Sequence, residues 1–165
     1  VSHGASDGFK ISMNVIAMLI GFISLIAMLD WMLLHIGHWF SADLNLSLNW
    51  IFGKAFTPLA WSMGVPSQDV QSVATLLGQK LSVNEFVAFQ SLSQKAIPIV
   101  TEKGLLIVSI AICGFANFAS VGMQIGGIGE LAPSRRNELA KLGLKALYAG
   151  TMASYLSATI AGILM

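Results

Sequence analysis

The sequence is poor in charged residues. Only 10% of its 165 residues are Asp, Glu, Lys or Arg, whereas a soluble domain carries roughly 25%. Hydrophobic residues make up 55% of the chain, and the mean hydropathy is +0.74. This composition excludes an ordinary soluble domain and predicts an integral membrane protein.

The chain also lacks an excess of positive charge. Nine Lys and Arg against eight Asp and Glu give a net charge of +1, which excludes the basic surface that nucleic-acid binding needs. Cys113 is the single cysteine, so an internal disulfide is impossible, and no Cys or His cluster has the spacing of a metal site. His35 and His38 are one turn apart and are expected at the membrane surface. We expect no metal, no cofactor and no enzymatic activity, because no nucleophile and base pair is visible.

Long apolar runs are present, and they predict membrane-spanning helices. A helix needs about 20 apolar residues to cross the hydrocarbon core. Spanning helices are predicted over residues 11–37, 103–131 and 138–165. Residues 44–66 carry two Trp, a Lys and a Pro within an apolar pattern, which predicts a helix in the membrane interface. An ordinary loop helix is the alternative for that segment.

Residues 70–97 are predicted to form a re-entrant hairpin. The apolar pieces VQSVATLLGQ (70–79) and FVAFQSLSQ (86–94) are each about half the length needed to cross a bilayer, and they flank KLSVNE. Backbone that leaves a helix at membrane depth must be buried in protein or line a water-filled cavity. Lys80 lies near the predicted tip, so we expect it either to extend towards the membrane surface or to mark a tip one turn away.

Glu85 stands at the predicted tip of this hairpin. An acid inside the bilayer costs about 3 kcal/mol or more at mid-depth, so intramembrane acids are rare and usually functional. The alternative is a glutamate on an interfacial loop that never enters the membrane.

The predicted span 103–131 is interrupted at its centre by CGFANFAS, residues 113–120. Gly114 loosens the helix, and Asn117 and Ser120 place polar groups three residues apart on one face. A discontinuous helix at mid-membrane is typical of a transporter's binding site. The alternative is a continuous helix whose Asn and Ser bond to a neighbouring helix.

The last predicted span carries a small residue at every fourth position, at Ala146, Gly150, Ser154, Ala158 and Gly162. Small residues let the backbones of two membrane helices approach closely. This stripe predicts a helix-packing face along the final helix.

The motifs NEFVAF, CGFANFAS and GGIG, followed by APSRR and AGT, occur here in the order typical of one family. From about Ile11 to its end, the chain resembles the C-terminal half of the concentrative nucleoside transporters. In that family the transport domain is two inverted repeats, each with a re-entrant hairpin, a broken helix and a further helix. The resemblance implies an all-α integral membrane fold, with spanning helices, one re-entrant helical hairpin and one discontinuous helix, as one half of an inverted-repeat transporter.

The resemblance also implies a substrate site. The family's ligand contacts in this half, mainly to the ribose, fall on Glu85, Phe115, Asn117 and Ser120. Their chemistry fits, because a carboxylate can accept from two vicinal hydroxyls, while an amide and a hydroxyl both donate and accept. Phe115 would supply apolar contact. Ala119 departs from the serine that many relatives have, while Ser120 is retained.

The function implied is cation-coupled nucleoside symport, driven by sodium or protons, by a homotrimer in the plasma membrane. The other repeat, with most base contacts and the coupling-ion site, would lie in a missing N-terminal half, so this chain alone is not expected to transport. Because the chain ends with its last helix, we expect a bacterial inner-membrane protein. Two other functions stay open, a channel subunit with Glu85 in a charged filter and a non-transporting membrane scaffold.

Overall fold

The computed structural model describes residues 2–40 and 46–165. Every regular element in these two ranges is helical, which confirms the all-α class. The elements are α1 (Ser2–Phe40), α2 (Leu48–Ser62), α3 (Val70–Ser82), α4 (Glu85–Ser93), α5 (Glu102–Cys113), α6 (Phe118–Leu131), the 3-10 turn η1 (Pro133–Arg135) and α7 (Arg136–Leu164).

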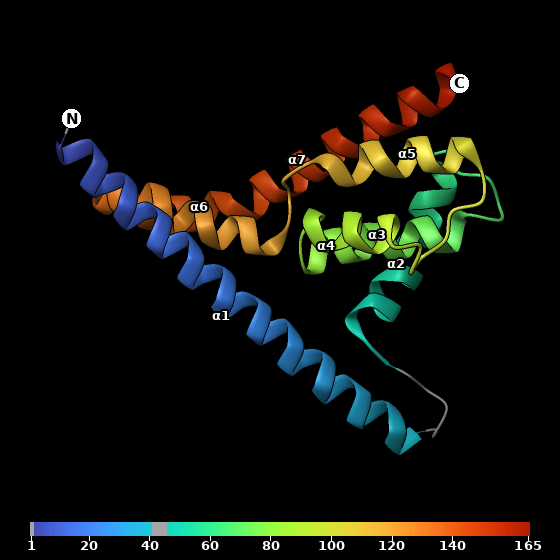
Figure 1. Cartoon of the computed structure of the whole chain (residues 1–165), viewed down its shortest axis with the longest axis horizontal. Helices are drawn as coiled ribbons and strands as arrows, with labels where there is room; N and C mark the ends of the chain where they lie inside the picture. The colour runs from blue at the N-terminus through green and yellow to red at the C-terminus, as the bar shows by residue number, and fades with distance from the viewer. Residues whose placement is uncertain (1, 41–45) are drawn as a thin grey trace.

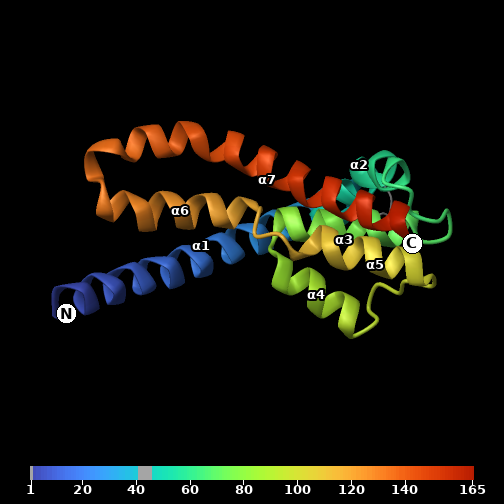
Figure 2. The same cartoon turned by 90° about the horizontal axis from the view of Figure 1, so that it is seen from above.

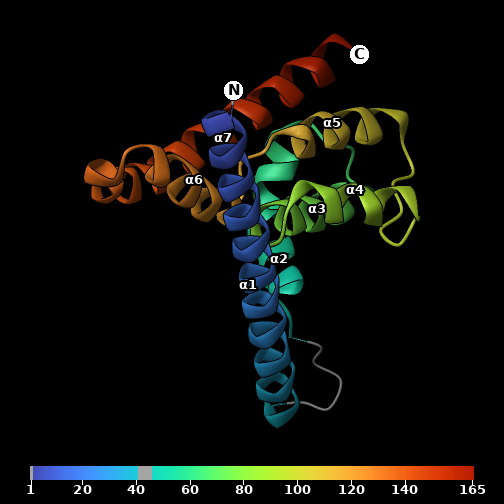
Figure 3. The same cartoon turned by 60° about the vertical axis from the view of Figure 1, so that its left-hand side comes forward.

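The helices form two groups joined by α7 (Figure 1). The long α1 packs against α6, and its far end meets α2, where the Leu48 amide donates to Asp30 Oδ1 over 2.7 Å. Helices α2 to α5 form a cluster on the other side of the molecule (Figure 3). Helix α7 runs back past α6 and then past α5, so it contacts both halves of the interrupted segment (Figure 2).

The buried core lies among α2, α3, α5 and α7. Helix α3 is its centre, with Val73, Leu76 and Leu77 fully buried. Glycine is required where α3 meets α2, because a Cβ at Gly78 would lie 2.6 Å from Phe52 Cβ. Tight packing of α3 against α2 therefore fixes the position of the α3–α4 hairpin.

Two helical stretches of the described chain are long and apolar enough to cross a bilayer, Glu102–Gly129 and Pro133–Leu164. Ile23–Trp39 is apolar but shorter. Helix α1 exposes Ile16, Ile20 and Met28 among other apolar side chains, and so large an apolar surface needs lipid or protein to cover it. The predicted membrane positions of 11–37 and the other segments stay predictions, and residues 44 and 45 of the segment 44–66 lie outside the described residues.

Asp69 ties the start of α3 to the start of α5. Its fully buried carboxylate accepts from the Val100 amide over 2.8 Å, from the Thr101 amide over 2.9 Å and from the Thr101 hydroxyl. Thr101 in turn caps α5 by accepting from the Gly104 amide over 3.0 Å. Burial disfavours the ionised carboxylate, but these hydrogen bonds outweigh it and lower the pKa of Asp69. The contact fixes the hairpin against the interrupted helix.

We expect Asp69→Asn to destabilise the folded protein at neutral pH by about 3 kcal/mol, because it replaces a charged acceptor of three donors. Since the native pKa of Asp69 lies below its unfolded value, this stabilisation is present above the unfolded pKa, about 3.9, and is lost as pH falls through the native pKa. Thermal unfolding of the full-length protein should show a gap from wild type that narrows in acid. Asp7→Asn, at an exposed site on α1, is the matched control. Equal stability of Asp69→Asn and wild type at neutral pH would contradict this role.

Candidate functional site

The segment between α5 and α6 is extended, and it ends at Asn117, the N-cap residue of α6. Helix α5 stops at Cys113, Gly114 and Asn117 have extended backbone, and α6 begins at Phe118. Asn117 caps α6, because its Oδ1 accepts from the Ser120 amide over 2.7 Å while Ser120 Oγ accepts from the Asn117 amide over 3.1 Å. This reciprocal capping box satisfies two amide donors at the helix start. The local sequence therefore specifies a new helix at this point.

The turn between α3 and α4 is capped in a similar way. Asn84 precedes α4, and its Oδ1 accepts from the Val87 amide over 2.9 Å. Helix α3 continues to Ser82, so the turn is shorter than the predicted KLSVNE tip. Of the two expectations for Lys80, extension towards the membrane surface is wrong, because Lys80 is fully buried in the last turn of α3, and the turn itself lies after Ser82.

A hydrogen bond joins the two capped helix starts. Asn117 Nδ2 donates to Glu85 Oε2 over 2.8 Å, although the two residues are 32 apart in the chain. Glu85 lies in the first turn of α4 and Asn117 is the N-cap of α6. Helix N-termini carry partial positive charge, so both ends favour a carboxylate at this place.

The four predicted site residues differ in accessibility. Asn117 is fully buried and Ser120 is 6% exposed, and the hydroxyl of Ser120 also donates to the Asn117 carbonyl over 2.7 Å. Glu85 is partly exposed, and no described residue donates to its second oxygen, Oε1. Phe115 is 54% exposed. In this arrangement Asn117 is enclosed and donates to Glu85, the carboxylate and the Phe115 ring are the more exposed groups, and Ser120 lines the cavity described next.

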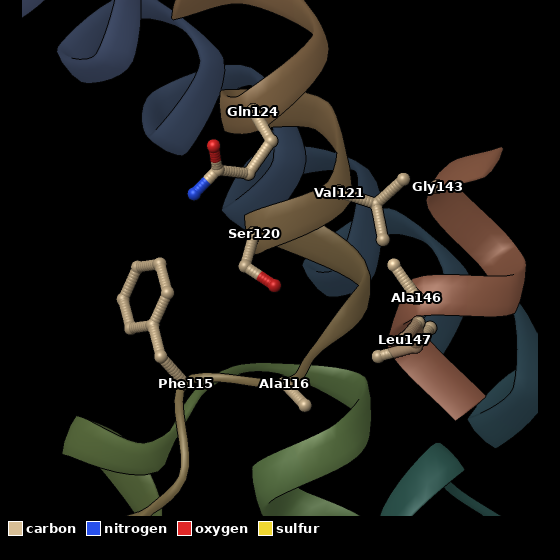
Figure 4. A pocket seen from close by; sticks show the side chains of 8 residues that line it. All are labelled: Phe115, Ala116, Ser120, Val121, Gln124, Gly143, Ala146 and Leu147. Atoms are coloured by element: carbon tan, nitrogen blue, oxygen red, sulfur yellow. The ribbon is translucent and has the colours of Figure 1, made fainter. Parts of the chain in front are cut away.

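A cavity of about 230 Å³ lies beside the break, between α6 and α7 (Figure 4). Ligand pockets for drug-sized molecules have volumes of about 300 Å³ or more, so this cavity can hold only part of such a ligand. It is lined by Phe115, Ala116, Ser120, Val121, Gln124, Gly143, Ala146 and Leu147. Glu85 does not line it but is linked to its wall through Asn117 and Ser120.

Gln124 is a lining residue that the sequence analysis missed. It lies four residues after Ser120 on α6, and its amide side chain reaches the same cavity as Phe115 (Figure 4). Residues four apart share one helix face, so counting on from Ser120 was the signal that could have found it. Among the described residues, no three His, Cys, Asp or Glu side chains gather as a metal site requires.

Close packing against α7 holds the break in place. A Cβ at Gly114 would lie 2.1 Å from Ser154 Oγ and 3.2 Å from Ser154 Cβ. Further along, a Cβ at Gly162 would lie 2.7 Å from Ile107. The small-residue stripe of the last helix thus faces α5 and the extended segment.

Gly114→Ala is expected to lower the stability of the full-length protein by about 1–3 kcal/mol, because the added methyl overlaps the Ser154 hydroxyl. Ser154→Ala alone should have little effect, since this hydroxyl donates only to Gly150 of its own helix. The double variant should regain most of the lost stability. Thermal unfolding of the four proteins gives the coupling energy, and strictly additive effects would contradict the contact.

Known proteins match this chain over nearly its whole length. The profile of the family described as "Na+ dependent nucleoside transporter C-terminus" matches residues 1–162. An uncharacterized transporter of Haemophilus influenzae is 45% identical over 99% of this chain and 40% of its own length. The nucleoside permease NupC of Helicobacter pylori is 36% identical, with 99% and 40% covered. The mouse sodium/nucleoside cotransporter 2 is 35% identical, with 99% and 27% covered.

Solved structures agree with these relatives. A variant of the transporter CNTnw in a state termed intermediate 2 matches with a TM-score of 0.89 at 39% identity, over 99% of this chain and 41% of that one. CNTnw in an inward-facing substrate-bound state matches with a TM-score of 0.77 at 39% identity, over 98% and 40%. The chain spans about two fifths of the length of the bacterial relatives. Because these relatives are transporters and permeases rather than enzymes, and because the family profile covers nearly the whole sequence, this chain belongs to the concentrative nucleoside transporter family and corresponds to its C-terminal part.

Proposed function

We propose that the transporter containing this chain carries nucleosides across the plasma membrane by cation-coupled symport. In this proposal, the chain supplies the part of the site that binds the ribose. The observation that carries it is the 2.8 Å hydrogen bond from Asn117 to Glu85, which sets a carboxylate at the meeting point of two helix starts.

The sugar-binding role follows from the groups left open around the break. A carboxylate oxygen that is already oriented can accept hydrogen bonds from vicinal hydroxyls, and charged acceptors make the stronger bonds. The second oxygen of Glu85 is available for this, and Phe115 offers an exposed apolar ring in the segment between α5 and α6. Gln124 adds an amide on the cavity wall that can donate or accept.

The membrane arrangement belongs to the same proposal. The α3–α4 hairpin would enter the bilayer without crossing it, and α5 and α6 would form one discontinuous spanning helix whose break lies at mid-depth. The extended residues 114–117 would then be tolerated because they face protein and a water-filled cavity. Helix α7 would span beside both halves, with which it packs.

An N-terminal half is needed to complete the site, since the local cavity holds only part of a ligand. The remaining walls, the coupling-ion site for sodium or protons, and the scaffold of a homotrimer are proposed to lie there. A bacterial inner membrane is the proposed location, in keeping with the Haemophilus and Helicobacter relatives. A channel with Glu85 in a filter is not favoured, because the relatives are transporters and permeases.

The test is uptake by the full-length protein in proteoliposomes. We expect radiolabelled uridine or adenosine to accumulate when an inward sodium or proton gradient is imposed, and not in empty vesicles or without a gradient. Comparing the two gradients identifies the coupling ion. Ion conductance without nucleoside accumulation under either gradient would contradict the proposal.

A further inference from the structure

Lys80 is a charged side chain that the proposed ribose site does not use. It lies in the last turn of α3 and is fully buried. Its ammonium offers three donors, and no described residue accepts a hydrogen bond from it. Because this chain itself encloses the side chain, a charge on it carries a desolvation cost that groups of the surrounding helices can offset.

Two neighbours place the ammonium at the end of α5. Lys80 Nζ lies 4.0 Å from the position that a Cβ would take at Gly114, the residue that ends α5. It also lies 5.5 Å from the centroid of the Tyr155 ring on α7, which is within the range of a cation–π contact. The ammonium therefore stands where α3, α5 and α7 meet.

The helix ends around Lys80 are negative. The last four carbonyls of a helix lack intrahelical donors and carry partial negative charge. For α5 these are the carbonyls of residues 110–113, and no described backbone group outside the helix donates to them. Helix α3 ends two residues after Lys80, so its own negative end is also near.

Lys80 and Glu85 form opposite poles of one site. Glu85 follows Lys80 by five residues, across the turn that joins α3 and α4, and the two side chains form no direct ion pair. Glu85 lies at the positive ends of α4 and α6, and Lys80 lies at the negative ends of α3 and α5. In discontinuous transporter helices, half-helix C-terminal ends and unwound carbonyls are where cations bind.

We propose that the Lys80 ammonium is a tethered cation, which permanently occupies a monovalent-cation site at the end of α5. It is a positioning residue, because it acts through the helix break and Glu85 and does not touch the nucleoside. Removing the side chain should leave a site that a small free cation of the same chemistry can enter. The proposal uses the proposed function only for its binding measurement.

The experiment compares Lys80→Ala and Lys80→Met in the full-length transporter. The alanine variant lacks the three methylenes and the ammonium that follow Cβ in lysine. Propylammonium has the same number of carbon and nitrogen atoms as this missing part. Methionine fills the space without a charge. We expect both variants to bind uridine at least about tenfold more weakly than wild type. Propylammonium chloride should raise the unfolding temperature of Lys80→Ala and restore its uridine affinity, whereas choline chloride at equal concentration should not. Wild type and Lys80→Met should not respond.

Three results would overturn the proposal. The first is wild-type uridine affinity in either variant. The second is weaker uridine binding by folded Lys80→Ala with no effect of propylammonium on its unfolding temperature or its uridine affinity. The third is a response of Lys80→Met to propylammonium equal to that of Lys80→Ala. If Lys80→Ala does not fold, the affinity of Lys80→Met decides, since weakened binding supports the role of the charge and unchanged binding overturns it. If wild type binds no nucleoside, the proposal of a ribose site fails, and the unfolding temperature alone tests the cation site. A rise with propylammonium that is confined to Lys80→Ala supports the cation site. No such rise overturns the cation site.

Discussion

Glu85→Gln is expected to weaken nucleoside binding by about 100-fold or more, while the transporter stays folded. The substitution keeps the size of the side chain and an oxygen for Asn117, but it removes the charge. Hydrogen bonds to a charged acceptor contribute about 1.5–3 kcal/mol each, so two hydroxyl contacts account for the expected loss. Isothermal titration of the full-length protein with uridine measures it.

The matched control for this substitution is Glu102→Gln. Glu102 also lies in the first turn of a helix, α5, but it is exposed and away from the break. We expect wild-type uridine affinity for that variant. A loss of similar size in both variants would mean that the general charge of the protein, and not the carboxylate at the site, is responsible.

The second large effect is expected for Asn117→Asp. Aspartate is as good an N-cap as asparagine, so α6 should still start at Phe118. However, the 2.8 Å donor to Glu85 becomes a second carboxylate, and two carboxylates this close cannot both stay ionised without strong repulsion. We expect uridine binding to fall about 100-fold or more, because Glu85 is displaced or neutralised.

Two companion variants separate the cap from the contact with Glu85. Asn117→Ala removes both the helix cap and the hydrogen bond to Glu85. It should therefore be less stable than Asn117→Asp, by about 1 kcal/mol for the loss of the cap alone. The double variant Glu85→Gln with Asn117→Asp exchanges donor and acceptor, so the hydrogen bond can form again. Its unfolding temperature should therefore exceed that of Asn117→Asp, whereas its uridine affinity should stay low. If Asn117→Asp binds uridine as wild type does, the hydrogen bond to Glu85 does not position the carboxylate.

Local sequence signals account for much of the fold. The all-α class follows from composition and apolar runs, and the chain's family from an ordered set of motifs. The start of α6 also has a local signal that the sequence analysis did not use, because asparagine is a preferred N-cap residue. These features depend on residues that are close together in the chain.

Features that depend on distant contacts could not be read in this way. The Asn117–Glu85 bond joins residues 32 apart, and the sequence did not predict it, since the family resemblance only assigned both residues to one substrate site. The contacts of Asp69 with residues 100 and 101 have a similar separation and no local pattern. For Lys80 the sequence left two positions open, and only the packing of α3 against its neighbours, which encloses the side chain, excludes the one at the membrane surface.

The central claim is that Glu85 recognises the hydroxyls of the ribose. The most direct test is calorimetric titration of the full-length transporter with uridine and with 2′,3′-dideoxyuridine, for wild type and for Glu85→Gln. The account predicts that wild type binds uridine much more tightly than the dideoxy analogue and that Glu85→Gln binds the two almost equally. Equal affinity of wild type for the two nucleosides, or a preference for uridine that survives in Glu85→Gln, would contradict it.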